Sequence, residues 1–128
     1  MLRYNLFLLN VTLVVAFAAC GMALGKTQNF NWRPVVIMHG LNGNAKEFGT
    51  IERTLKNTYP GIYVHTLNIL NGNKSQFTNM SKQMQIIRET ILSDPKLKSG
   101  FNFYGESQGA LEARIYVSEF SDIPVYNL

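Results

Sequence analysis

The sequence predicts an α/β fold in which a mostly parallel sheet is flanked by helices. Short apolar runs typical of buried strands alternate along the chain with longer segments whose apolar residues recur at helical spacing. Strict alternation of strand and helix is typical of parallel sheets joined by crossover helices. The 128 residues are 46% hydrophobic and 16% charged. This composition suits one globular domain with a core and excludes a disordered chain.

Residues 1–25 have the pattern of a secretory signal peptide, which is set aside before the fold is considered. Arg3 provides a positive start, an apolar run follows over residues 6–20, and Ala23-Leu24-Gly25 offers small residues before a cleavage point. An uncleaved membrane anchor is the alternative, but the run is short and polar Asn10 interrupts it. We therefore expect residues 26–128 to form the mature part, with no stable membrane span.

Two sequons, Asn73-Lys74-Ser75 and Asn79-Met80-Ser81, lie close together in a polar stretch. Beside a signal peptide they favour a eukaryotic secretory pathway, with a glycan on Asn73 or Asn79. The single cysteine, Cys20, would leave with the signal, so packing alone must stabilise the mature part. Ala18-Ala19-Cys20 also weakly resembles a bacterial lipoprotein signal, although Phe17 is unusual there.

The first predicted strand spans residues 35–39, a continuous apolar run of the kind that is buried on both faces of a parallel sheet. A helix capped by Asn44 follows and stops at Pro60-Gly61. Its apolar residues at helical spacing are Phe48, Ile51, Leu55 and Tyr59. The second strand is predicted at residues 62–67, and residues 68–79 are expected to form a polar loop.

The second predicted helix has an apolar face and stops at Asp94-Pro95; that face is made of Met80, Met84, Ile87 and Ile91. The third strand is predicted at residues 101–104, a further helix begins at about Gln108, and a fourth strand covers residues 123–128. A crossover helix should cover such a strand, because a parallel sheet is buried on both faces. The sequence therefore reads as an α/β domain truncated after about four strands.

The stretch Gly105-Glu106-Ser107-Gln108-Gly109 has the form G-x-S-x-G and joins the third strand to the next helix. A serine on such a sharp turn holds its hydroxyl out of the sheet in strained backbone geometry. Gly105 and Gly109 avoid a side-chain clash across the turn, and the helix N-terminus favours negative charge near Ser107. We predict that Ser107 is a nucleophile; the alternative is a glycine-rich turn in an ordinary α/β domain.

The chain resembles the palmitoyl-protein thioesterases, a lysosomal branch of the α/β-hydrolases. The stretches that carry the resemblance are PVVIMHGL at residues 34–41, PGIYVHTLNI at 60–69, DPKLKSG at 94–100 and YGESQG at 104–109. The resemblance implies hydrolysis of the thioester between a fatty acyl chain and the cysteine of an S-acylated protein or peptide, with no cofactor. It also implies Ser107 as the nucleophile and the backbone N–H groups of Leu41 and Gln108 as the oxyanion hole.

The sequence departs from the family pattern at several places. Ala110 stands where the family usually has another glycine, and Asn42-Gly43-Asn44 replaces the cysteines that some members carry. The catalytic acid and histidine of this fold follow the serine along the chain, but no histidine follows Ser107. The carboxylates that do follow it are Glu112, Glu119 and Asp122. We therefore expect the 128-residue chain alone to be inactive.

The two histidines, His39 and His65, lie at or near predicted strands and are interpreted as satisfied structural residues. Neither has a partner at the spacing of metal ligands, so no metal site is predicted. The net charge of +4 comes with no basic run, so nucleic-acid binding is not expected. Two other functions stay open, a general lipase or carboxyl esterase and a non-catalytic truncated paralogue. The expected location is the secretory pathway, ending in the lysosome or outside the cell.

Overall fold

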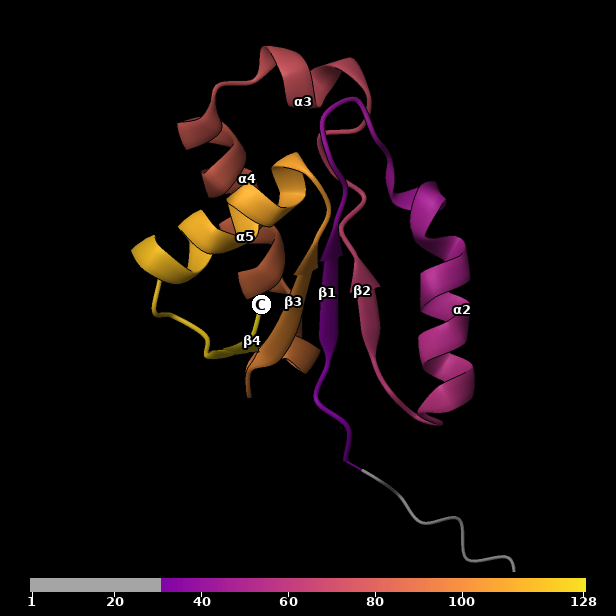
Figure 1. Cartoon of the computed structure of the whole chain (residues 1–128). Helices are drawn as coiled ribbons and strands as arrows, with labels where there is room; N and C mark the ends of the chain where they lie inside the picture. Colours follow the sequence, from indigo (N-terminus) through magenta and orange to yellow (C-terminus); the bar gives the residue numbers. More distant parts are fainter. Residues whose placement is uncertain (1–30) are drawn as a thin grey trace, which may run out of the picture.

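The computed structural model describes residues 31–128, so the predicted signal peptide lies outside the described residues. The chain forms a four-stranded parallel sheet in the order β2-β1-β3-β4, with helices on both faces (Figure 1). The predicted α/β class is confirmed. Within residues 31–128, no helix has both the length and the apolar character needed to cross a membrane.

All four predicted strands are present, each with bounds within two residues of the prediction. They are β1 (Val35–Met38), β2 (Val64–Thr66), β3 (Phe101–Gly105) and β4 (Val125–Asn127). The helical elements are the short 3-10 helix η1 (Ala45–Phe48), α2 (Gly49–Thr58), α3 (Asn73–Phe77), α4 (Met80–Ser93), the 3-10 helix η2 (Pro95–Leu97) and α5 (Gln108–Glu119). The helix after β3 therefore begins at Gln108, as predicted.

The prediction of a loop over residues 68–79 is wrong in its middle, where α3 forms. This helix of five residues buries only one of them, Ser75, whose hydroxyl donates to the carbonyl of Gly72 at 2.8 Å. Sequence periodicity detects a helix by its repeating apolar face, and a single polar buried residue provides no such repeat. The apolar pattern of the sequence therefore could not predict α3.

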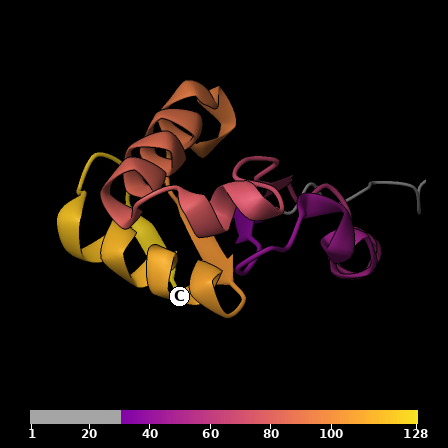
Figure 2. The same ribbon diagram turned by 90° about the horizontal axis from the view of Figure 1, so that it is seen from above.

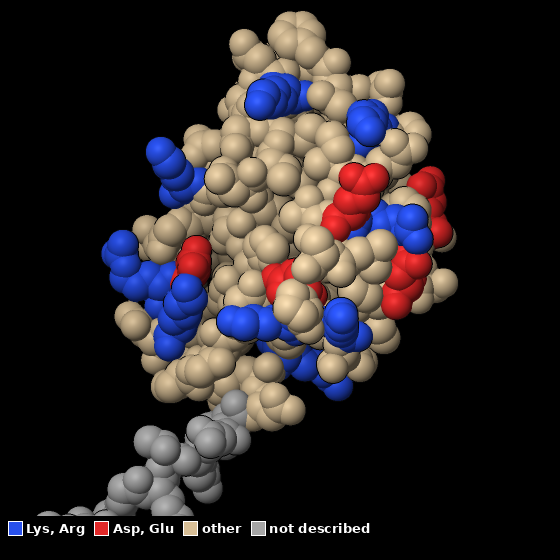
Figure 3. All heavy atoms as spheres, turned by 180° about the vertical axis from the view of Figure 1, so that it is seen from behind, with Lys and Arg blue, Asp and Glu red and all other residues tan. Residues whose placement is uncertain are grey.

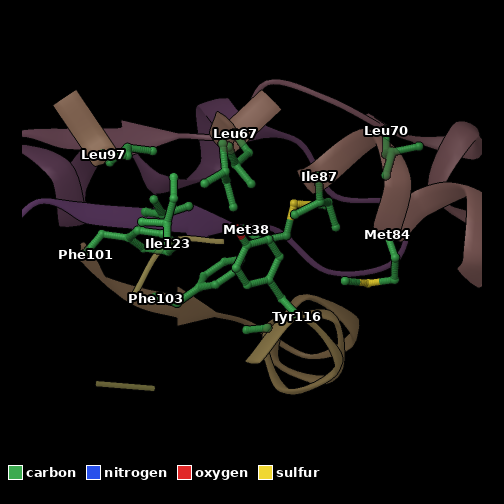
Figure 4. Close-up of a cluster of buried hydrophobic side chains, with 13 residues drawn as sticks. Met38, Leu67, Leu70, Met84, Ile87, Leu97, Phe101, Phe103, Tyr116 and Ile123 are labelled. Atoms are coloured by element: carbon green, nitrogen blue, oxygen red, sulfur yellow. The ribbon is translucent and has the colours of Figure 1, made fainter. Parts of the chain in front are cut away.

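The two faces of the sheet are covered by different helices and carry cores of unequal size (Figure 2). Side chains alternate along β1, so Val36 and Met38 point to the face under α4 and α5, and Ile37 points to the face under α2. The larger core is shown in Figure 4 and consists of Val36, Met38, Leu67, Leu70, Met84, Ile87, Ile91, Leu97, Phe101, Phe103, Ala113, Tyr116 and Ile123. The smaller one is Ile37, Phe48 and Val64.

The carboxyl ends of the parallel strands meet at one edge of the sheet, and α3 lies over that edge (Figure 1). Two hydrogen bonds join the segment after β1 to the segment around α3. The N–H of Gly72 donates to the carbonyl of Gly43 at 2.9 Å, and the N–H of Asn42 donates to the hydroxyl of Ser75 at 2.8 Å. The loops at this edge therefore form one connected frame, and the turn that carries Ser107 belongs to the same edge.

Candidate active site

Ser107 lies between the end of β3 and the start of α5, with φ 52° and ψ −120°. This conformation is costly for a residue with a side chain, so the surrounding contacts must hold it. The N–H of Glu106 donates to the carbonyl of Met38 at 3.1 Å, and the N–H of Gly109 donates to that of Glu106 at 2.8 Å. Ser107 is exposed, and its hydroxyl makes no hydrogen bond within the described part of the chain.

Glycines allow the backbone to come together around this turn. A Cβ atom on Gly105 would lie 2.3 Å from the carbonyl oxygen of Gly109, and one on Gly109 would lie 2.5 Å from the carbonyl oxygen of Met38. A Cβ atom on Gly40 would lie 3.0 Å from the Cβ of Ser107 and 3.5 Å from its hydroxyl oxygen. The segment after β1 is therefore in direct contact with Ser107.

The N–H groups of Leu41 and Gln108 have no acceptor among residues 31–128. Gln108 is the first residue of α5, where the helix cannot provide a partner. The amides that follow each of them are bonded: Asn42, Gly43, Gly109 and Ala110. Two free N–H groups beside a serine hydroxyl can stabilise the oxyanion of a tetrahedral intermediate, and the N-terminus of α5 adds to that stabilisation.

Neither histidine forms a hydrogen bond with Ser107 among residues 31–128. His39 is buried, with Nδ1 2.8 Å from the carbonyl oxygen of Gly40 and Nε2 2.8 Å from that of Ile69. Each ring nitrogen faces a carbonyl oxygen, which only accepts, so the nitrogen that carries the proton is the donor; the ring lies between the loop after β1 and the chain after β2. This agrees with its interpretation as a satisfied structural residue.

His65 lies on the edge strand β2, with β1 between it and β3. Its Nδ1 is 2.6 Å from Oδ2 of Asp94, which also accepts a hydrogen bond from the hydroxyl of Tyr63 at 2.6 Å. The described hydrogen bonds of His65 therefore lead to Asp94 and not to Ser107.

A buried polar group behind the turn was missed by the sequence reasoning. Glu112 is fully buried on α5, its Oε1 accepts from Nε2 of Gln108 at 2.9 Å, and its Oε2 has no partner in the described chain. Burial raises the pKa of this carboxyl, against smaller opposing effects of the Gln108 hydrogen bond and the His39 charge. Gln83 is also buried and accepts from the same Gln108 amide at 2.9 Å. The available signal was a polar residue on an apolar helical face, since Gln83 precedes Ile87 by four residues.

Two hollows adjoin α5. One of about 330 Å³ lies beside the turn and is lined by Phe103, Tyr104, Gly105, Ala110, Ala113, Arg114 and Leu128. The larger, of about 460 Å³, lies between α4 and α5 and does not include Ser107. On the face shown in Figure 3, acidic and basic side chains are interspersed. Among residues 31–128, no three histidine, cysteine or acidic side chains lie close enough together to hold a metal ion.

Comparisons with known proteins agree with this arrangement. A family model described as palmitoyl protein thioesterase matches residues 34–128. The chain is 38% identical over 96 residues to palmitoyl-protein thioesterase 3 of Dictyostelium discoideum, which covers 74% of this chain and 33% of that protein. It is 29% identical over 103 residues to palmitoyl-protein thioesterase 1 of Caenorhabditis elegans, with 74% and 35% covered.

A third relative is the lysosomal thioesterase PPT2 of Homo sapiens, 28% identical over 93 residues that cover 72% of this chain and 30% of that protein. The chain spans about a third of the length of these curated relatives. The four-stranded parallel sheet with its flanking helices is part of an α/β-hydrolase fold. The chain belongs to the palmitoyl protein thioesterase family.

Proposed function

We propose that this chain carries the nucleophile half of a serine hydrolase that cleaves fatty-acyl thioesters from protein cysteines. The observation that carries the proposal is an exposed Ser107 in strained geometry beside two free N–H groups. The hydroxyl of Ser107 attacks the thioester carbonyl, and the N–H groups of Leu41 and Gln108 stabilise the oxyanion. The carbon–sulfur bond breaks, and the cysteine leaves as a thiolate that takes up the proton lost by the Ser107 hydroxyl. Water then hydrolyses the acyl-serine, which releases the fatty acid and restores Ser107.

A thioester is a better substrate than an oxygen ester for a site that consists of Ser107 and the two N–H groups. A cysteine thiol has a pKa of about 8.5, so the leaving thiolate depends little on protonation by an acid. The serine itself still needs a base, because a hydroxyl at its ordinary pKa is a weak nucleophile. Both histidines of this sequence are engaged elsewhere. We therefore propose that the catalytic acid and base lie outside these 128 residues and that this chain alone turns over very slowly.

The test uses the complete gene product that carries this sequence and a palmitoyl-cysteine peptide as substrate. Ser107→Ala should lower kcat by about 10³-fold or more, because the oxyanion hole alone leaves only residual catalysis. Ser118→Ala, an exposed serine on the same helix, is the control and should keep full activity. Loss of the serine without loss of turnover would refute the role of Ser107.

A matched oxygen ester separates the thioesterase from a general lipase or carboxyl esterase. A thioesterase should prefer the thioester at equal acyl length, whereas a lipase should prefer the oxygen ester. If neither substrate is turned over by the complete product, the non-catalytic alternative stands. Brisk, Ser107-dependent turnover by the 128-residue chain itself would instead show that its own residues provide the base.

We further propose that residues 1–25 are removed on secretion, with delivery to the lysosome or the outside of the cell, and that Asn73 or Asn79 carries a glycan. Both asparagines are exposed. Asn79 caps α4 through its oxygen, which accepts from the N–H of Lys82 at 2.9 Å. A glycan is attached to the amide nitrogen, so the cap survives modification. Secreted material that begins at Met1 and keeps its mass after glycosidase treatment would contradict both parts.

A further inference from the structure

We infer that Gln83, on α4, is a positioning residue that fixes the separation of the Leu41 and Gln108 N–H groups. The inference rests on the proposed function and deepens it, because those two groups form the proposed oxyanion hole. Gln83 is distant from Leu41 and from Gln108 in the sequence, and no described hydrogen bond joins it to Ser107. It acts through a buried hydrogen-bond network that reaches both segments.

The orientation of the Gln83 amide is fixed by its own contacts. Its Nε2 donates to the carbonyl of Ser75 at 3.0 Å and to the carbonyl of Thr78 at 2.6 Å. Carbonyl oxygens only accept, so the amide nitrogen must face them and the amide oxygen must face the other way. The side chain is 3% exposed, so no bulk water can replace these bonds. Gln83 therefore presents Oε1 to α5.

On that side lies Gln108, whose backbone N–H is one of the two free donors. The Nε2 of Gln108 donates to Oε1 of Gln83 and to Oε1 of Glu112, both at 2.9 Å. Two buried acceptors on two different helices thus hold the side chain of the residue that begins α5. The first turn of α5 cannot shift without breaking one of these bonds.

On the other side, Ser75 connects the network to Leu41. The hydroxyl of Ser75 accepts from the N–H of Asn42 at 2.8 Å and donates to the carbonyl of Gly72 at 2.8 Å. Asn42 follows Leu41 directly and has φ 58°, a strained conformation that this bond helps to hold. A continuous path therefore runs from Asn42 through Ser75 and Gln83 to Gln108.

Placement of the donors matters because an oxyanion hole works by preorganisation. Loss of one donor typically lowers kcat by about 10²–10³-fold, and a displacement of about 1 Å can cost about 10²-fold. The close contact between Gly40 and Ser107 sets how near the loop after β1 comes to the start of α5. Gln83 adds a second connection between them, through its hydrogen bonds to Ser75 and Gln108. Removing Gln83 should therefore weaken stabilisation of the transition state more than binding of the substrate.

The experiment compares Gln83→Met with Gln85→Met in the complete gene product. Methionine keeps the length of the side chain and removes its hydrogen bonds, and Gln85 is an exposed glutamine on the same helix. With the palmitoyl-cysteine peptide, Gln83→Met should lower kcat about 10–100-fold and leave KM within about twofold. The amide ¹H–¹⁵N signals of Leu41, Asn42 and Gln108 should shift in Gln83→Met and stay in place in Gln85→Met.

Ser75→Ala breaks the same path at another bond and keeps the fold of α4 untouched. Its effect on kcat should be less than additive with that of Gln83→Met, because either change alone already disconnects the donors. If Gln83→Met does not fold, the Ser75→Ala variant provides the test. Because this change also removes the sequon at Asn73, wild type and variant are compared as protein produced without glycans. Unchanged kcat together with unchanged amide signals would overturn the inference.

The experiment also distinguishes a merely structural role of Gln83 from failure of the proposed function. If active-site titration shows that Gln83→Met lowers the number of active sites but not kcat per site, Gln83 is merely structural and the inference is wrong. If the wild-type protein turns over no thioester, the proposed function fails. The amide signals of Leu41 and Gln108 then decide by themselves whether Gln83 couples the two segments.

Discussion

The Asp94 cluster beside strand β2 and the Ser107 turn at the end of β3 differ in how far their polar groups are satisfied. At Asp94, one carboxylate accepts hydrogen bonds from the hydroxyl of Tyr63, from Nδ1 of His65 and from the N–H of Lys96. At Ser107, the hydroxyl and the two nearby N–H groups find no acceptor or donor among residues 31–128, and the backbone is strained.

The comparison teaches that a histidine beside an aspartate is not by itself an enzyme. Burial, the largest influence, raises the pKa of Asp94, but the hydrogen bonds of Tyr63, the Lys96 N–H and His65 together outweigh it and lower the pKa. Burial and the neighbouring Asp94 raise the pKa of Tyr63 to about 12. These shifts favour the ionised form of Asp94 and the protonated form of the Tyr63 hydroxyl. The groups that we propose to react are instead the ones left without partners among residues 31–128, around Ser107.

The largest effect is expected from a substitution that disrupts the turn carrying Ser107. Gly105→Ala places a Cβ 2.3 Å from the carbonyl of Gly109, so the turn must open or the chain must fail to fold. We expect a loss of about 3–5 kcal/mol in the free energy of unfolding, measured by denaturant titration. Gly49→Ala is the matched control, because no atom lies within 4 Å of its added Cβ and its backbone is helical. If the two variants are equally stable, the turn is not built as described.

A smaller effect is expected on the Asp94 side. Asp94→Asn removes the charge that three donors converge on, and we expect a loss of about 1–2 kcal/mol at pH 7. The folded-state pKa of Asp94 is lowered, so its stabilisation is present above the unfolded pKa of about 3.9 and is lost as the pH falls through the folded value. The difference between variant and wild type should therefore shrink below about pH 4.

Denaturant titrations of Asp94→Asn at pH 7 and pH 3 measure this change, with Glu89→Gln, an exposed carboxylate on α4, as the control. The variant should also leave thioester turnover by the complete product nearly unchanged. A large loss of kcat in a folded Asp94→Asn protein would erase the distinction between a structural cluster and a catalytic turn.

The contrast also shows what a sequence alone can predict. The strands and the turn were predicted because their signals are local: apolar runs such as residues 35–38, and glycines two positions on either side of Ser107. The His65–Asp94 pair joins residues 29 positions apart, and no local pattern encodes a contact between a strand and the residue that follows a distant helix. The bond between Gln83 and Gln108, which are 25 positions apart, was missed for the same reason. The short helix α3 was missed because it has no apolar repeat.

The smallest expected effect tests the buried carboxyl behind the turn. Burial raises the folded-state pKa of Glu112, so the folded protein binds this proton more tightly than the unfolded chain does. Stability is then unaffected below the unfolded pKa of about 4.3 and falls as the pH rises through the folded value. Glu112→Gln cannot ionise and keeps an oxygen that can accept from Gln108. Relative to wild type, the variant should become more stable as the pH rises from 4 to 8.

Each unit by which burial raises this pKa corresponds to about 1.4 kcal/mol of that difference, so the total change in relative stability between low and high pH measures the shift. Thermal or denaturant unfolding of both proteins at several pH values provides this total change. The change should exceed that of Glu119→Gln, an exposed carboxylate on the same helix. A wild-type protein that is stabilised relative to Glu112→Gln as the pH rises would mean that the carboxylate is ionised and paired in the fold. Glu112 would then resemble Asp94, and the buried side of the Ser107 turn would be as fully satisfied as the cluster on β2.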